Sequence, residues 1–259
     1  MMKQLSLPGL FSQKVVNVAS VPHRSPFRYP GGKTWLVPRV RTWLQSLQFH
    51  PATIFEPFAG GGIVGLTVAF EELADQVTLV ELDEQVAAVW QAIIEDGDGP
   101  WLADSLLSFE LSPTSVDALL RETDLPTKQR ALQTIVRNRV NRGGILAKGA
   151  GKLKYGENGR GLHSRWYPQT LARRIRDIDR IRDRLSFVHG DGLGCIEKSS
   201  EQSDAVFFVD PPYTASSKKP GSRLYDCSQL DHELLFALMA AVKGDFLMTY
   251  DNVDEIRQL

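Results

Sequence analysis

The residues with the clearest chemical potential are Asp210, Pro211, Pro212 and Tyr213, which follow an apolar run at residues 205–209. The exocyclic amine of a nucleobase is a weak nucleophile, because its lone pair is delocalised into the ring. Such an amine needs acceptors that draw on its hydrogens as a new bond forms. The Asp210 carboxylate and the Pro211 carbonyl can supply them on a stiffened loop, and Tyr213 offers a face for stacking. A rigid turn with a capping Asp remains an equal interpretation of this string alone.

A glycine-rich segment could hold a nucleotide-like ligand. Phe58, Gly60 and Gly62 lie between an apolar run at residues 53–55 and a helical pattern that begins at residue 63. Glycine allows the backbone to approach a ligand closely. Glu81 ends the next apolar run, where a carboxylate can accept ribose hydroxyls. The glycines do not match the dinucleotide pattern cleanly, so a tight turn and a surface acid stay open.

Two further residues could serve the same ligand. Lys33 follows a glycine pair and begins a helical pattern at residues 34–47. A nucleotide-hydrolysing loop is disfavoured because Phe27 stands where its first glycine belongs. Lys33 could instead contact the carboxylate end of a nucleotide-like cofactor. Asp191 follows a short strand pattern and could accept from an adenine amine of that cofactor, or simply cap a helix.

The elements around these residues alternate between strand and helix patterns. Continuous apolar runs such as residues 205–209 are typical of central parallel strands. The sequence therefore predicts an α/β fold with a doubly wound sheet. Residues 1–24 are expected to form an arm, residues 25–112 and 186–259 the core, and residues 113–185 a mainly helical insert. A charged amphipathic helix is expected over residues 171–185.

Charge is distributed unevenly along the chain. Residues 71–124 hold fourteen acidic residues and one basic residue, whereas residues 128–184 hold sixteen basic and four acidic ones. A basic block within a chain of net charge −1 favours a polyanion such as nucleic acid, although a solvated helical face gives the same pattern.

Composition excludes several other classes. No apolar run approaches the roughly 20 residues of a membrane helix, and the N-terminus lacks the features of a signal peptide. The two cysteines show no CxxC spacing, so a disulfide framework or a zinc site is not expected, and a reducing cytoplasm is. Neither cysteine follows a proline, which disfavours a cytosine-C5 methyltransferase.

Taken in order, FRYPGGK, FEPFAGGG, VEL and VDPPY resemble the Dam-type family of DNA adenine-N6 methyltransferases, from about residue 25 to the end. The resemblance implies a Rossmann-like S-adenosylmethionine-dependent methyltransferase sheet with an inserted DNA-recognition region, and no metal. The expected reaction is direct methyl transfer to the N6 amine of a flipped adenine in duplex DNA. The implied catalytic residues are Asp210, Pro211, Pro212 and Tyr213, and the implied cofactor-binding residues are Tyr29, Lys33, Phe58, Gly60, Gly62, Glu81, Asp191 and Asp210.

The same family places its target-recognition region between the glycine loop and DPPY, where the basic block lies. The string RNRVNRGG resembles the family segment that approaches DNA, and Arg and Asn suit contacts with phosphate and bases. The predicted DNA-binding residues are Arg137, Asn138, Arg139, Asn141, Arg142 and Lys152.

The chain departs from the family pattern near its end. Family members continue beyond the strand that ends near Tyr250 with a further helix and a β-hairpin, so the chain resembles a truncated member. An exposed sheet edge would then favour self-association. The alternatives are a catalytically impaired DNA-binding remnant and an RNA adenine methyltransferase, although the latter usually carries Asn at the position of Asp210. The resemblance fits a cytoplasmic bacterial or phage enzyme acting on DNA, including one from a restriction–modification pair.

Overall fold

The protein is described by a computed structural model that covers residues 20–28, 32–147, 149–156, 159–212 and 230–250. Five parallel strands form its single described sheet, in the order β3-β2-β1-β4-β5. The strands are β1 (Thr53–Glu56), β2 (Gln76–Glu81), β3 (Leu185–His189), β4 (Ala205–Val209) and β5 (Asp245–Met248). This all-parallel sheet confirms the predicted α/β class and is consistent with a Rossmann-like methyltransferase fold.

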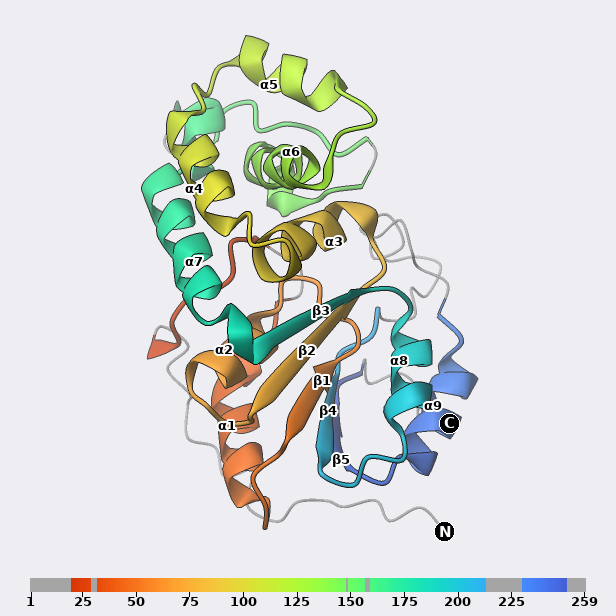
Figure 1. The fold of residues 1–259 in the computed structure, drawn as a ribbon. Coiled ribbons are helices and arrows are strands. Elements are labelled where there is room, and N and C mark those ends of the chain that lie inside the picture. The colour runs from red at the N-terminus through yellow and green to blue at the C-terminus, as the bar shows by residue number, and fades with distance from the viewer. Residues whose placement is uncertain (1–19, 29–31, 148, 157–158, 213–229, 251–259) are drawn as a thin grey trace.

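Alternate residues of the central strands supply two hydrophobic cores. Ile54, Val206 and Phe208 belong to the larger core, whereas Phe55 and Phe207 stack on each other in the smaller one, with ring centroids 5.2 Å apart. This alternation follows from the opposite directions of successive side chains in a strand. Helices α1 (Val37–Ser46) and α2 (Ile63–Phe70) lie on the larger core, and α8 (Gly192–Ser199) and α9 (His232–Ala241) cover the other face (Figure 1).

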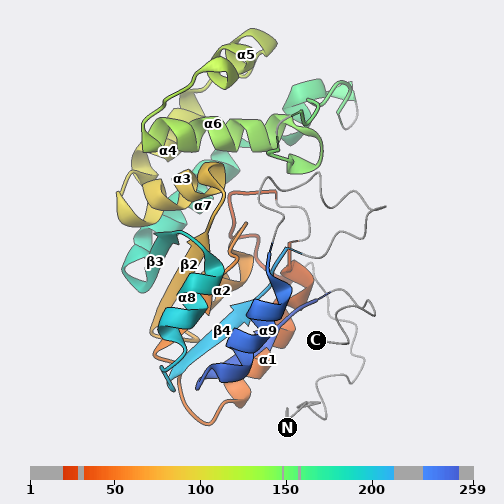
Figure 2. The same ribbon diagram turned by 90° about the vertical axis from the view of Figure 1, so that its right-hand side faces the viewer.

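A layer of helices lies beyond the end of the sheet at which β2 leads into α3 (Figures 1 and 2). The helices are α3 (Glu84–Trp90), α4 (Gly99–Ser108), α5 (Pro113–Arg121), α6 (Thr127–Val140) and α7 (Pro168–Arg180). A π-helical turn, η3 (Gln91–Glu95), continues α3. The strongest packing joins α4 to α7 and α3 to α6, and buried residues of all four helices belong to the larger core. The helical layer and the sheet therefore share one core, and the boundary at residue 113 stays a prediction.

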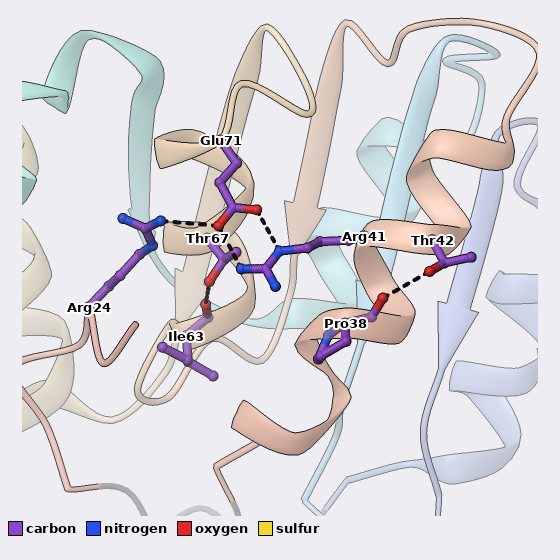
Figure 3. A network of polar contacts seen from close by, with 7 residues as sticks. All are labelled: Arg24, Pro38, Arg41, Thr42, Ile63, Thr67 and Glu71. Atoms are coloured by element: carbon purple, nitrogen blue, oxygen red, sulfur yellow. Dashed lines mark hydrogen bonds and ion pairs between the residues drawn. The ribbon is translucent and has the colours of Figure 1, made fainter. Parts of the chain in front are cut away.

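An ion-pair network ties the first described residues to the sheet helices (Figure 3). Glu71, at the end of α2, accepts from Arg41 Nε at 2.5 Å and from Arg24 Nη2 at 3.1 Å. The Arg24 guanidinium also lies 4.3 Å from the centroid of the Phe70 ring, a cation–π distance. The pKa of Glu71 is lowered because hydrogen bonds and charge from both arginines outweigh desolvation, which alone would raise it. One carboxylate thus anchors both α1 and the segment before it.

Most helix and strand predictions agree with the observed elements. The charged helix is an exception, because α7 ends at Arg180 and a short 3-10 turn, η7 (Arg182–Arg184), leads directly into β3. Leu185 therefore begins a strand and does not continue the apolar stripe of the helix. Within the described residues, no helix is both long enough and apolar enough to span a bilayer.

Candidate active site

The site lies where the strand order changes direction. Strand β1 has β2 on one side and β4 on the other, and the helices that follow β1 and β4 lie on opposite faces of the sheet. Open α/β sheets bind ligands in the crevice that this arrangement leaves beyond the carboxyl ends of the strands. Glu56 ends β1, Glu81 ends β2 and Asp210 directly follows β4, so three carboxyl groups converge there.

Asp210 is held by two residues from distant parts of the chain. Its Oδ2 lies 2.7 Å from Lys33 Nζ, and its Oδ1 accepts from the Thr249 hydroxyl at 2.5 Å. The Thr249 backbone N–H also donates to Val209 O at 2.9 Å, which continues the pairing of β5 with β4 past the last strand residue. The predicted catalytic acid and the predicted cofactor lysine are thus brought together, with side chains 19% and 8% exposed.

The glycine loop after β1 is shaped by positive φ angles and by contact with α3. Gly60 and Gly62 adopt φ angles of 48° and 62°, a region that favours glycine. The Trp90 indole Nε1 donates to Gly60 O at 2.9 Å, and a Cβ on Gly62 would lie 3.1 Å from the Trp90 ring. The Gly60 N–H donates to Glu81 Oε2 at 2.8 Å, so the loop and the acid of β2 form one unit.

Glu81 sits where a ribose-binding carboxylate is expected. Its Oε1 accepts from the Asp83 N–H at 2.8 Å, while Asp83 caps the start of α3. Burial is the largest cause that raises the Glu81 pKa to about 7. A carboxylate offers about four lone-pair positions, so the two main-chain bonds leave Glu81 able to accept further donors.

Phe58 packs against Gly192, the residue that follows Asp191. A Cβ on Gly192 would lie 2.8 Å from the Phe58 ring and 2.4 Å from Pro57 O, so only glycine permits this approach. Asp191 caps α8 and accepts from Leu193 N at 3.3 Å and Gly194 N at 3.4 Å. The capping interpretation of Asp191 is therefore confirmed, and its cofactor role stays a prediction.

Glu56 is a site residue that the sequence reasoning missed. It is buried, and its Oε2 accepts from the Gly65 N–H at 2.7 Å. Burial is the main cause that raises its pKa to about 8, and the charges of Asp210 and Glu81 add to the effect. An acidic residue that directly ends an apolar strand and precedes a glycine loop was the available signal.

The predicted DNA-binding residues have different environments. The structure buries Asn138, Arg139 and Asn141, whose side chains donate to main-chain oxygens of Arg28 and Gly144, of Pro26, and of Ile145, respectively. Arg142 is exposed, Arg137 contacts Gln85 and Gln133, and Lys152 pairs with Asp117. Buried side chains reach a duplex only after rearrangement, so the accessible members of the set are the exposed Arg142 and the half-buried Arg137 and Lys152. Tyr29 and Tyr213 lie outside the described residues.

A parallel sheet with a glycine loop after β1 and carboxylates at its strand ends is consistent with a Rossmann-like methyltransferase fold. The family model described as D12 class N6 adenine-specific DNA methyltransferase matches residues 29–259. The chain therefore belongs to that family of transferases, which confirms the predicted resemblance and enzyme class. No match was found among curated proteins.

Proposed function

We propose that this protein transfers a methyl group from S-adenosylmethionine to the N6 amine of an adenine flipped out of duplex DNA. The observation that carries the proposal is the convergence of Asp210 and Lys33 beside the glycine loop, at the switch point of the sheet. When bound, S-adenosylmethionine supplies an electrophilic methyl group on a sulfonium centre. The family match supports adenine in DNA as the acceptor.

The residues present fit this cofactor. The positive-φ glycines Gly60 and Gly62 leave room for close backbone approach, and Glu81 at the end of β2 suits the two ribose hydroxyls. Phe58 adds an apolar side to the same loop, while Asp191 lies at the start of α8 for the adenine amine. The ammonium of Lys33 can hold Asp210 and an anionic carboxylate together, because an ammonium has three donors. Tyr29 is proposed to contribute to the same site.

Asp210 and Pro211 act on the target amine. Lys33 and Thr249 fix the two oxygens of the Asp210 carboxylate, so an acceptor is oriented before the base arrives. The Pro211 carbonyl accepts the second amine hydrogen, and Pro212 limits motion of the loop. Tyr213 is proposed to stack on the flipped base. These contacts strengthen as positive charge develops on the attacking nitrogen, which lowers the barrier to transfer.

The duplex is proposed to contact the segment after α6. The backbone N–H of Arg142 donates to Gly151 O at 3.0 Å, and Asn141 and Lys152 form an isolated antiparallel bridge, so this segment folds back on itself. Its exposed residues include Arg142, Lys154 and Tyr155. Basic groups bind phosphates and an exposed aromatic ring can stack on bases. The Gln85 amide donates to Leu146 O at 3.4 Å, so this segment lies beside the start of α3, the helix that follows β2 and Glu81.

Methyl transfer from labelled S-adenosylmethionine to unmethylated duplex DNA, followed by nucleoside analysis, tests the proposal. Label in N6-methyladenine is the expected outcome, and mapping the modified positions gives the recognition sequence. A parallel reaction with RNA tests the alternative of an RNA adenine methyltransferase, which would label RNA and not DNA. Binding of both cofactor and duplex by folded protein without transfer would instead establish the impaired DNA-binding alternative.

A further inference from the structure

We infer that Asn138 is a positioning residue that couples DNA binding to cofactor binding, an inference that rests on the proposed function. Asn138 lies in the last turns of α6 and is 0% exposed. Its Oδ1 accepts from the Arg28 N–H at 2.8 Å, and its Nδ2 donates to Arg28 O at 3.0 Å and to Gly144 O at 2.7 Å. One side-chain amide thus uses both donors and its acceptor to join two separate main-chain segments.

Residues 24–28, which we name the strap, are held by the helical layer at two further points. Arg174 of α7 donates to Ser25 O at 3.0 Å, and Arg139 of α6 donates to Pro26 O. Burial lowers the pKa of Arg139 to about 10, which leaves its guanidinium charged at neutral pH. Three polar side chains from α6 and α7 therefore bind main-chain atoms of the strap. These bonds do not depend on the side chains of the strap.

The other side of the strap faces the proposed cofactor site. The Phe27 ring meets the Trp90 ring edge-on, with centroids 5.5 Å apart. Trp90 in turn holds Gly60 O through its indole N–H. The strap also precedes Lys33, whose ammonium binds Asp210. A change in strap position would therefore act on the glycine loop through Phe27 and Trp90.

Gly144 provides the link to DNA. It lies in the turn η4 (Arg142–Gly144), next to the exposed Arg142 that we assign to phosphate contact. Its φ is 78°, and a Cβ there would lie 2.2 Å from Arg28 O, so the strap and the DNA segment touch through their backbones. Asn138 bonds to both sides of this contact. Contact of Arg142 with a duplex would thereby act on the strap and on the cofactor residues that it supports.

Such coupling is reciprocal, because each ligand must change the affinity of the other by the same factor. The expected effect of a duplex on wild-type protein is a gain of about fivefold or more in affinity for the cofactor. Removal of the Asn138 amide should leave two ligand sites that no longer affect each other. A residue that only stabilised the fold would instead weaken both sites and preserve the factor between them.

The coupling factor is the ratio of the affinity for S-adenosylhomocysteine with saturating unmethylated duplex to the affinity without it. Isothermal titration calorimetry measures both affinities. We expect Asn138→Ala to reduce the factor to below about twofold. Thr134→Val is the matched control, because Thr134 is equally buried on α6 and its hydroxyl has no hydrogen-bond partner among the described residues. Arg174→Met, which keeps an aliphatic stem and removes the bond to Ser25 O, is a second variant in case Asn138→Ala does not fold. It should lower the factor partially.

The outcomes separate the two proposals. A wild-type factor near one, with both ligands bound, would overturn the coupling and leave the proposed function standing. An undiminished factor in Asn138→Ala, or in Arg174→Met where the first variant does not fold, would also overturn it. Wild-type protein that binds neither ligand would refute the proposed function, and the coupling with it.

Discussion

Glu56 and Gly65 are in direct contact across the first strand–helix unit of the sheet. The Glu56 Oε2 atom accepts from the Gly65 N–H at 2.7 Å, and a Cβ on Gly65 would lie 2.6 Å from the same oxygen. The carboxyl group is therefore enclosed by backbone on one side. The negative charges of Asp210 and Glu81 also act on it. This enclosure makes Glu56 a source of pH-dependent stability.

Glu56→Gln should flatten the pH dependence of stability. The folded pKa of about 8 lies above the ordinary value of 4.5, so the folded protein keeps a proton that the unfolded chain releases between these values. The stabilisation is complete below about pH 4.5 and is lost as the pH rises toward 8, by up to about 5 kcal/mol. Glutamine can still accept from Gly65, so urea unfolding at several pH values should show a shallower decline for the variant. Glu84→Gln, at an exposed position, is the control and should lose stability with rising pH as the wild type does. An equal loss of stability in Glu56→Gln would contradict the prediction.

Asp210→Asn should abolish most methyl transfer while the fold is retained. The amide keeps the size of the side chain but loses the charge that pairs with Lys33. Loss of a preorganised electrostatic contact typically lowers kcat by about 100- to 1000-fold. Single-turnover transfer from labelled cofactor measures the effect. Asp204→Asn, an exposed residue at the opposite end of β4, is the control. Near-wild-type turnover by Asp210→Asn would remove Asp210 from catalysis.

Thr249→Val should lower the transfer rate by about tenfold, because a hydrogen bond to a charged acceptor contributes roughly 1.5 kcal/mol or more. The variant removes the hydroxyl that orients Asp210 Oδ1 and keeps the branched shape. Affinity for S-adenosylhomocysteine should change much less than kcat. Thr114→Val, on the exposed surface of α5, serves as the reference. A change confined to cofactor affinity would show that Thr249 supports binding and not the orientation of Asp210.

Arg142→Ala should weaken duplex binding and reduce its salt dependence. Each phosphate contact that is lost lowers the slope of log affinity against log salt by about 1. Fluorescence anisotropy with a labelled duplex over a range of salt concentrations measures the slope. Lys198→Ala removes an equally exposed charge from α8, away from the helical layer, and should leave the slope unchanged. Equal slopes for both variants and wild type would place Arg142 outside the interface.

Much of the fold was predictable because its signals are local. Apolar runs such as Ala205–Val209 can only be buried on both faces, which indicates central parallel strands. Glycines after one strand and an acid at the end of the next predicted a ligand crevice, since the carboxyl ends of parallel strands share one edge. The assignment to an adenine methyltransferase depended on the order of these motifs, which the family match confirms.

The roles of Asn138 and Lys33 depended on tertiary structure. The resemblance of RNRVNRGG to a family segment predicted DNA contact for Asn138, whereas the packing of α6 turns its amide toward the main chain of Arg28 and Gly144. Lys33 meets Asp210 because β4, which Asp210 follows, pairs with β1 although the two strands are far apart in the sequence. The sequence by itself determined which elements form and which chemical groups they carry. Only the packing decided which of those groups are buried and which meet, because burial and long-range contacts depend on how separate helices and strands fit together.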